Sequence, residues 1–130
     1  MELVLENCKS KSGKHAIATR LYKYEGDKFV EVKEYKILER LRPTYTVGEA
    51  VKVDVPSSGI YIMLRFVRNI KGRYFGRIIV YENGVASTEI KYRKLKLFTV
   101  YGYKKHVELV KRLMDELKIT VKRVNVGNAV

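Results

Sequence analysis

Cationic and aromatic side chains alternate with apolar ones in the second half of the chain. Between residues 73 and 82 the odd positions hold Arg73, Phe75, Arg77, Ile79 and Tyr81. If this segment is a β-strand, these side chains share one face of a sheet, because successive residues point to opposite faces. Cations follow phosphates, and rings stack on bases that a duplex keeps hidden. The pattern therefore predicts a surface for single-stranded nucleic acid.

Neighbouring segments add the same residue types to that surface. Each ring taken singly is also a good strand residue that packs against cross-strand neighbours, so the prediction depends on the whole set. We expect the cations to contact phosphates and the rings to stack on bases. The expected phosphate contacts are Arg65, Arg68, Lys71, Arg73, Arg77, Lys94 and Lys96, and the expected stacking residues are Phe75, Tyr81 and Phe98, with Tyr61 as a weaker candidate.

The net charge of +13 is concentrated in the same half of the chain. Residues 1–55 hold 11 basic and 9 acidic side chains, whereas residues 56–130 hold 16 basic and 5 acidic. No acidic residue interrupts 65–77 or 91–105. A surface that serves solubility alone mixes both signs. The uneven charge therefore predicts a polyanionic partner.

Composition and terminal sequence exclude several classes of protein. A single cysteine, Cys8, cannot form an internal disulfide, and two histidines cannot complete a usual zinc site. No apolar run reaches the ~18 residues of a membrane helix, and the acidic first residues do not resemble a signal peptide. We expect an intracellular, cytoplasmic protein without membrane association, metal or cofactor. The absence of Gln and Trp indicates a thermophilic source, archaeal or archaeal-viral.

Local patterns predict a sheet with one helix. Alternation and turn residues indicate strands at 15–24, 29–38, 47–55, 60–68, 73–82, 85–92, 94–101 and 119–126. In the segment 94–101, Leu95, Leu97, Thr99 and Tyr101 are expected to face the core. Residues 103–118 repeat apolar side chains at three- and four-residue steps and predict a helix. The expected fold class is α+β, mainly an antiparallel β-sheet with one C-terminal amphipathic helix. We expect a single domain over residues 1–130, with a sub-boundary near 56–59.

Several short motifs between residues 60 and 118 point to a known family. They are Phe66-Val67-Arg68, Lys71-Gly72-Arg73, the run Arg77 to Glu82 and the basic stretch Lys91 to Lys94, ahead of an amphipathic helix. In these the segment resembles the single-stranded-DNA-binding domain of the PC4 transcriptional coactivator family. The resemblance implies four antiparallel strands followed by a helix, a homodimer formed through the helices, and single strands held on basic, aromatic-bearing strands. The chain lacks the family's usual helix Trp and has extra segments on both sides. Duplicated PUR-type and Whirly-type sheets share the same strand-rich, single-helix pattern.

A second pattern favours a different fold. The run Gly48 to Val53 resembles the strand opening of small OB and SH3-like barrels, so a small barrel plus helix is the alternative architecture. An OB barrel also binds single strands, so the expected function is the same for both folds.

Two other functions compete with single-strand binding. Glu89-Ile90-Lys91 has the Glu-x-Lys spacing of Mg-dependent nucleases. Such enzymes also need an Asp about one strand earlier to hold the metal, and Arg77 stands there. The other alternative is a basic interaction or viral structural protein that binds an acidic partner. We expect non-enzymatic binding of single-stranded nucleic acid, with DNA favoured over RNA and no catalytic residue. A homodimer is expected because a small sheet with one helix leaves apolar surface uncovered.

Overall fold

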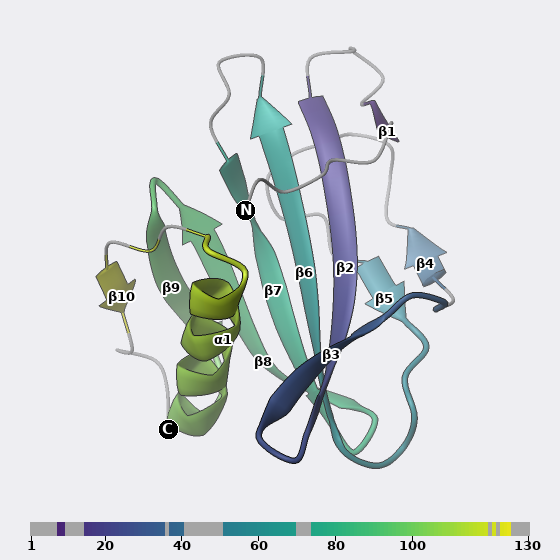
Figure 1. Cartoon of the computed structure of the whole chain (residues 1–130). Helices are drawn as coiled ribbons and strands as arrows, with labels where there is room; N and C mark the ends of the chain where they lie inside the picture. The colour runs from purple at the N-terminus through teal and green to yellow at the C-terminus, as the bar shows by residue number, and fades with distance from the viewer. Residues whose placement is uncertain are drawn as a thin grey trace.

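The computed structural model describes residues 8–9, 15–35, 37–40, 51–69, 74–119, 121 and 123–125. Figure 1 shows the helix lying against one face of a twisted sheet, on the side of β8 and β9. The strands are β1 (Cys8–Lys9), β2 (His15–Glu25), β3 (Lys28–Val32), β4 (Ile37–Arg40), β5 (Val51–Val53), β6 (Ile60–Asn69), β7 (Tyr74–Glu82), β8 (Val85–Arg93), β9 (Lys96–Tyr101) and β10 (Arg123–Asn125), and the helix is α1 (Lys104–Glu116).

Eight of these strands form one open sheet. Their order is β1-β2-β6-β7-β8-β9-β10, and β3 pairs with the other end of β2. The pairings are antiparallel except that of β9 with β10, which the chain reaches by crossing through α1. The predicted class, α+β with a mainly antiparallel sheet and one helix, is confirmed. No described pairing joins the two ends of this sheet, β1 and β10, so the barrel alternative is wrong for the described residues.

The N-terminal and C-terminal parts of the chain share this sheet. Strand β2 pairs with β6 along its whole length, from His15 opposite Asn69 to Tyr24 opposite Ile60. Helix α1 also holds the β2–β3 hairpin. The Arg112 guanidinium donates a 3.2 Å hydrogen bond to the Tyr24 hydroxyl and lies 5.6 Å from the centre of that ring. The loop at 56–59 leads from β5, which pairs with β4 in a separate two-stranded sheet, into β6 of the large sheet.

Tight turns set the register of the basic strands. Asn83 and Gly84 join β7 to β8 with φ values of 53° and 81°, as the Asn-Gly signal predicts for a type I′ hairpin. Lys94 and Leu95 join β8 to β9 with φ values of 52° and 62°. Neither of these two residues favours the left-handed region, which costs about 1–3 kcal/mol per non-glycine residue. The β8–β9 turn therefore places Lys94 at its tip at an energetic cost.

The main core lies between the sheet and α1. Val107, Val110, Leu113 and Met114 of α1 are buried against β6, β7, β8 and β9, as their spacing predicts. Gly76 of β7 allows close approach here, since an added Cβ would collide with the Arg65 carbonyl of β6. On either side of Gly76, the rings of Phe66 and Tyr92 pack edge to face, with centroids 5.3 Å apart.

Candidate nucleic-acid interface

The sheet face opposite α1, called here the open face, is divided into a covered part and an exposed part. Near β5, the side chains of Val32, Tyr35, Val53 and Val55 pack over this face and form a second apolar cluster. Over β8 and β9, side chains on the same face are exposed to solvent. The exposed part contains the predicted combination of cations and rings. We call its residues the β8–β9 strip: Lys91, Arg93, Lys94, Lys96 and Phe98.

Strand register brings the members of this strip together. Lys91 of β8 lies directly opposite Phe98 of β9, and Arg93 lies directly opposite Lys96. Directly opposed residues of an antiparallel pair have Cβ atoms about 4.5–5.5 Å apart. The Phe98 side chain is 37% exposed although it is large and apolar. Lys94 stands at the tip of the turn, so it lies beyond the strand and not within it as predicted. Phe98, with its exposed ring, thus lies beside Lys91 on one neighbouring strand and pairs through its backbone with Asn125 on the other.

Arg65 and Arg77 extend the positive charge across the sheet. Arg65 of β6 lies opposite Arg77 of β7, which in turn lies opposite Lys91 of β8. Arg77 is partly buried and its Nη1 lies 2.8 Å from the Glu89 Oε1. The structure therefore places both predicted arginines on the open face, and it gives Arg77 a carboxylate partner.

The rings of Tyr81 and Tyr61 lie in the covered part of the open face. Tyr81 is only 4% exposed, and its hydroxyl is hydrogen-bonded to the backbone of Val53. Burial raises the pKa of this phenol. Tyr61 is also buried in the same cluster. The prediction that Tyr81 and Tyr61 stack on bases is wrong, because alternation identifies the face but does not reveal that residues 53–55 pack on it.

Some predicted contacts fall where the side chains are not described. Arg68 of β6 pairs with Tyr74, and Phe75 of β7 pairs with Val67 and Arg93, as backbone positions. Lys71 and Arg73 lie outside the described residues. These four residues remain predictions.

Three features of this face were missed or misplaced from the sequence. Lys91 and Arg93 were not among the expected nucleic-acid contacts, although Lys91 was a candidate nuclease residue and the alternation used for the other strands points to both. Tyr101 was expected in the core but is 44% exposed. A register shift leaves Val100 unpaired between Thr99 and Tyr101, which turns Tyr101 to the open face beside Glu89. Hydrophobic alternation cannot locate such an irregularity.

A buried hydrogen-bond network lies on the other face, at the start of α1. The Tyr103 N–H donates to the Thr88 Oγ1 at 3.0 Å, and this hydroxyl lies 2.6 Å from the His106 Nδ1. The His106 Nε2 lies 3.1 Å from the Glu82 carboxylate, which also accepts from Lys105. Burial lowers the pKa of His106, and the hydrogen bond from Lys105 lowers the pKa of Glu82. A neutral His106 satisfies this network if Thr88 donates to Nδ1 and the Nε2–H donates to Glu82.

This order of hydroxyl, imidazole and carboxylate is also used by nucleophilic enzymes. The Thr88 side chain, however, is fully buried, and its oxygen already accepts the Tyr103 N–H. Gly102 packs directly against Thr88 as well, because an added Cβ there would collide with the threonine side chain. The geometry leaves a substrate no approach to the hydroxyl, so the network fixes the helix start to the sheet.

Glu89 and Lys91, the residues of the nuclease alternative, are not arranged as in a metal site. The Glu89 carboxylate is held by Arg77, the residue that stands where the second acid of such a site is needed. Among the described residues, no group of three or more His, Cys, Asp or Glu side chains is placed to hold a metal ion. The Glu89 carboxylate is therefore paired with an arginine and not placed beside a second acid.

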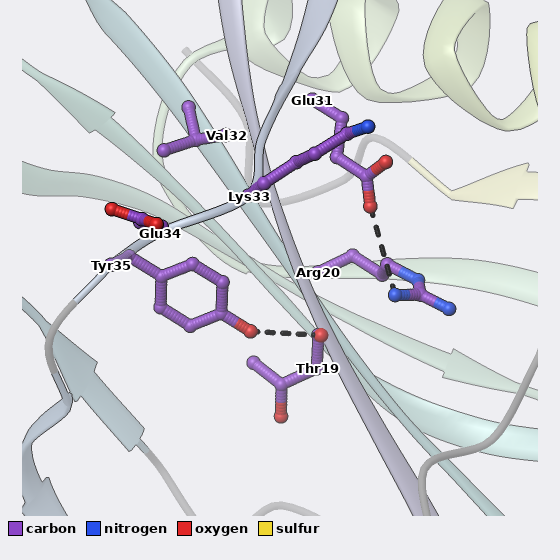
Figure 2. Close-up of a pocket in the computed structure, with 7 residues that line it drawn as sticks. All are labelled: Thr19, Arg20, Glu31, Val32, Lys33, Glu34 and Tyr35. Carbon is purple, nitrogen blue, oxygen red and sulfur yellow. Dashed lines mark hydrogen bonds and ion pairs between the residues drawn. The ribbon is translucent and has the colours of Figure 1, made fainter.

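A pocket of about 620 Å³ lies at the edge of β2, where β3 ends (Figure 2). Two acidic and two basic side chains are among its lining residues. The Tyr35 hydroxyl donates a 2.9 Å hydrogen bond to the Thr19 carbonyl, and Arg20 lies 3.6 Å from Glu31. Because these charges cancel, the pocket lacks the excess of positive charge that the β8–β9 strip carries.

Comparison with known proteins does not extend these observations. No protein family, no curated protein and no solved structure matches the chain. Residues 60–118 do form β6, β7, β8, β9 and α1 in the order that the resemblance to the coactivator family implies. Membership of that family remains a prediction. None of the helices in the described part of the chain has the length and apolar character needed to cross a membrane.

Proposed function

We propose that this protein binds single-stranded nucleic acid through the β8–β9 strip, without catalysing a reaction. The observation that supports this most strongly is the pairing of Lys91 with the exposed ring of Phe98. A cation beside a ring can contact the phosphate of a nucleotide while the ring stacks on the base of the same nucleotide. Single-stranded DNA is the favoured ligand, and the non-specific chemistry of these contacts gives little sequence preference.

The nucleic-acid strand crosses the β-strands in this proposal. Arg65, Arg77, Lys91 and Phe98 form one transverse row over β6, β7, β8 and β9. Neighbouring strands are about 4.8 Å apart, so the row is about 14 Å long. At the stacked spacing of about 3.4 Å per nucleotide, the row accommodates about four nucleotides. Short oligonucleotides therefore suffice to test the site.

A duplex reader would use a different part of the molecule. Major-groove recognition commonly inserts a helix. Here Lys105 of α1 is paired with Glu82, and Arg112 is held on the β2–β3 hairpin. The exposed side of α1 also carries Glu108, Asp115 and Glu116. These interactions and charges favour the open face over the helix as the binding surface.

Fluorescence anisotropy tests the proposal. Labelled single-stranded DNA, single-stranded RNA and duplex DNA of equal length are titrated with the protein at two salt concentrations. We expect tighter binding to the single strands and a steep loss of affinity with salt. Equal affinity for the duplex would show that stacking on unpaired bases does not contribute to binding.

Two further outcomes separate the alternatives. Capture of an acidic protein that is insensitive to nuclease treatment would favour the interaction-protein alternative. Cleavage of junction or flap DNA with Mg²⁺, lost in Glu89→Ala, would favour the nuclease.

The homodimer remains a prediction, which light scattering coupled to size-exclusion chromatography tests.

A further inference from the structure

Glu89 places a negative charge within the most positive part of the open face. Its carboxylate contacts Arg77, and both side chains are largely buried, at 12% and 23% exposure. Arg77 itself lies between Arg65 and Lys91 on the neighbouring strands. Like charges that face each other across strands repel. Glu89 therefore neutralises part of a row of three cations.

The contact between Glu89 and Arg77 leaves some of the arginine's hydrogen-bonding capacity unused. The Arg77 Nη1 contacts the Glu89 Oε1 at 2.8 Å. Its Nε is buried and has no hydrogen-bond partner among the described residues. A buried donor without a partner costs about 1–3 kcal/mol, and guanidinium groups bind anions best through two parallel hydrogen bonds. Arg77 is thus held by a carboxylate without reaching its best geometry.

A phosphate on the transverse row would compete for the same arginine. It carries a full negative charge and several acceptor oxygens, and a rotated Arg77 side chain can engage it with two donors. Glu89 would then be left beside the phosphate, where like charges repel. The carboxylate opposes binding in two ways, since it holds Arg77 and it repels the ligand.

We propose that Glu89 is an internal competitor that weakens the binding of single-stranded nucleic acid by occupying Arg77. This inference depends on the proposed function. On binding, Arg77 exchanges the Glu89 carboxylate for a phosphate oxygen, and on release the carboxylate takes the arginine back. Glu89 therefore favours release of the strand.

The variant Glu89→Gln tests this proposal, because it keeps the shape of the side chain and removes its charge. Anisotropy with an oligothymidylate is expected to show binding at least about fivefold tighter than wild type at low salt. The dependence of log affinity on log salt is expected to stay close to that of wild type, because Arg77 contacts a phosphate in the bound state of both proteins. Glu31→Gln is the matched control, since that carboxylate pairs with Arg20 at the β2–β3 edge. It removes the same charge and is expected to change affinity less than about twofold.

The outcomes separate this inference from the proposed function. If wild-type protein does not bind the oligothymidylate, the proposed function fails. If wild type binds but folded Glu89→Gln binds equally or more weakly, Glu89 has a structural role only and the inference is overturned. A measurement on wild type removes any dependence on the variant's folding. The ¹³C signal of the Glu89 carboxyl is expected to shift during titration with the oligothymidylate, and an unchanged signal in bound protein would contradict the exchange.

Discussion

Removing two lysines from the β8–β9 strip should reduce the salt dependence of binding by a defined amount. The strip contains four cations, and Arg65 and Arg77 add positive charge outside it. Each phosphate contact contributes about 0.7 to the log–log salt slope for single strands. The double variant Lys91→Ala, Lys96→Ala removes two contacts, so its slope should be lower than that of wild type by about 1.4. Over a fourfold rise in salt, wild-type binding should therefore weaken about sevenfold more than binding of the double variant.

The assay is fluorescence anisotropy with an oligothymidylate over a salt series from about 50 to 200 mM. The matched control is Lys104→Ala, Lys111→Ala, which removes the same charge from exposed positions of α1 on the other face of the sheet (Figure 1). Charges beyond the ~10 Å screening length contribute little, so the control should keep the wild-type slope. A slope that falls equally in both double variants would show that total charge, and not the strip, binds the strand.

Three other changes test separate parts of the structure. Phe98→Ala should weaken single-strand binding by about 1–3 kcal/mol without changing the salt slope, as measured by anisotropy. Lys94→Gly should stabilise the protein in urea by about 1 kcal/mol, since it relieves a positive φ, and should weaken binding. In wild type, the free energy of unfolding should fall as the pH drops from 7 to 5, because burial lowers the pKa of His106 below its ordinary 6.5 and the unfolded chain takes up the proton first. His106→Gln should be less stable at pH 7 and show a smaller fall, measured by urea unfolding at both pH values.

Each of these three predictions has an outcome that would contradict it. Tyr81→Phe is the control for Phe98→Ala, because it alters a buried ring; an equal loss of affinity in both would remove the stacking role. Unchanged stability in Lys94→Gly would show that the β8–β9 turn is not strained. An equal pH dependence in wild type and His106→Gln would assign the fall between pH 7 and 5 to other groups. Glu82 is not one of them, because its lowered pKa acts only below about pH 4.5.

Local sequence patterns were sufficient to predict most elements of the fold. Strict alternation predicted β6 and β7, the Asn83-Gly84 pair predicted the hairpin of β7 with β8, and three- and four-residue steps predicted α1. The pairing of β2 with β6 and the parallel pairing of β10 with β9 depend on contacts between distant segments. No local pattern specifies those pairings, so the open sheet could not be separated from a barrel in advance.

The types of residue in the candidate site were predicted from the sequence, but not all of the residues that belong to it. Alternation placed Phe98 and Lys96 on the correct face, and the same rule would have added Lys91 and Arg93. It could not show that residues 53–55 cover Tyr81, since that packing joins segments far apart in the chain. Nor could it show that Arg77 is paired with Glu89, because a diagonal cross-strand contact requires the register of both strands.

Mapping the bound strand by NMR tests the central claim most directly. During titration of ¹⁵N-labelled protein with an oligothymidylate, the backbone amides of residues 91–98 should show the largest chemical-shift changes. The amides of α1 beyond its first turn should change little, because α1 covers the opposite face of the sheet. Saturable changes centred on α1 or on the β2–β3 hairpin, with residues 91–98 unaffected, would contradict binding through the β8–β9 strip.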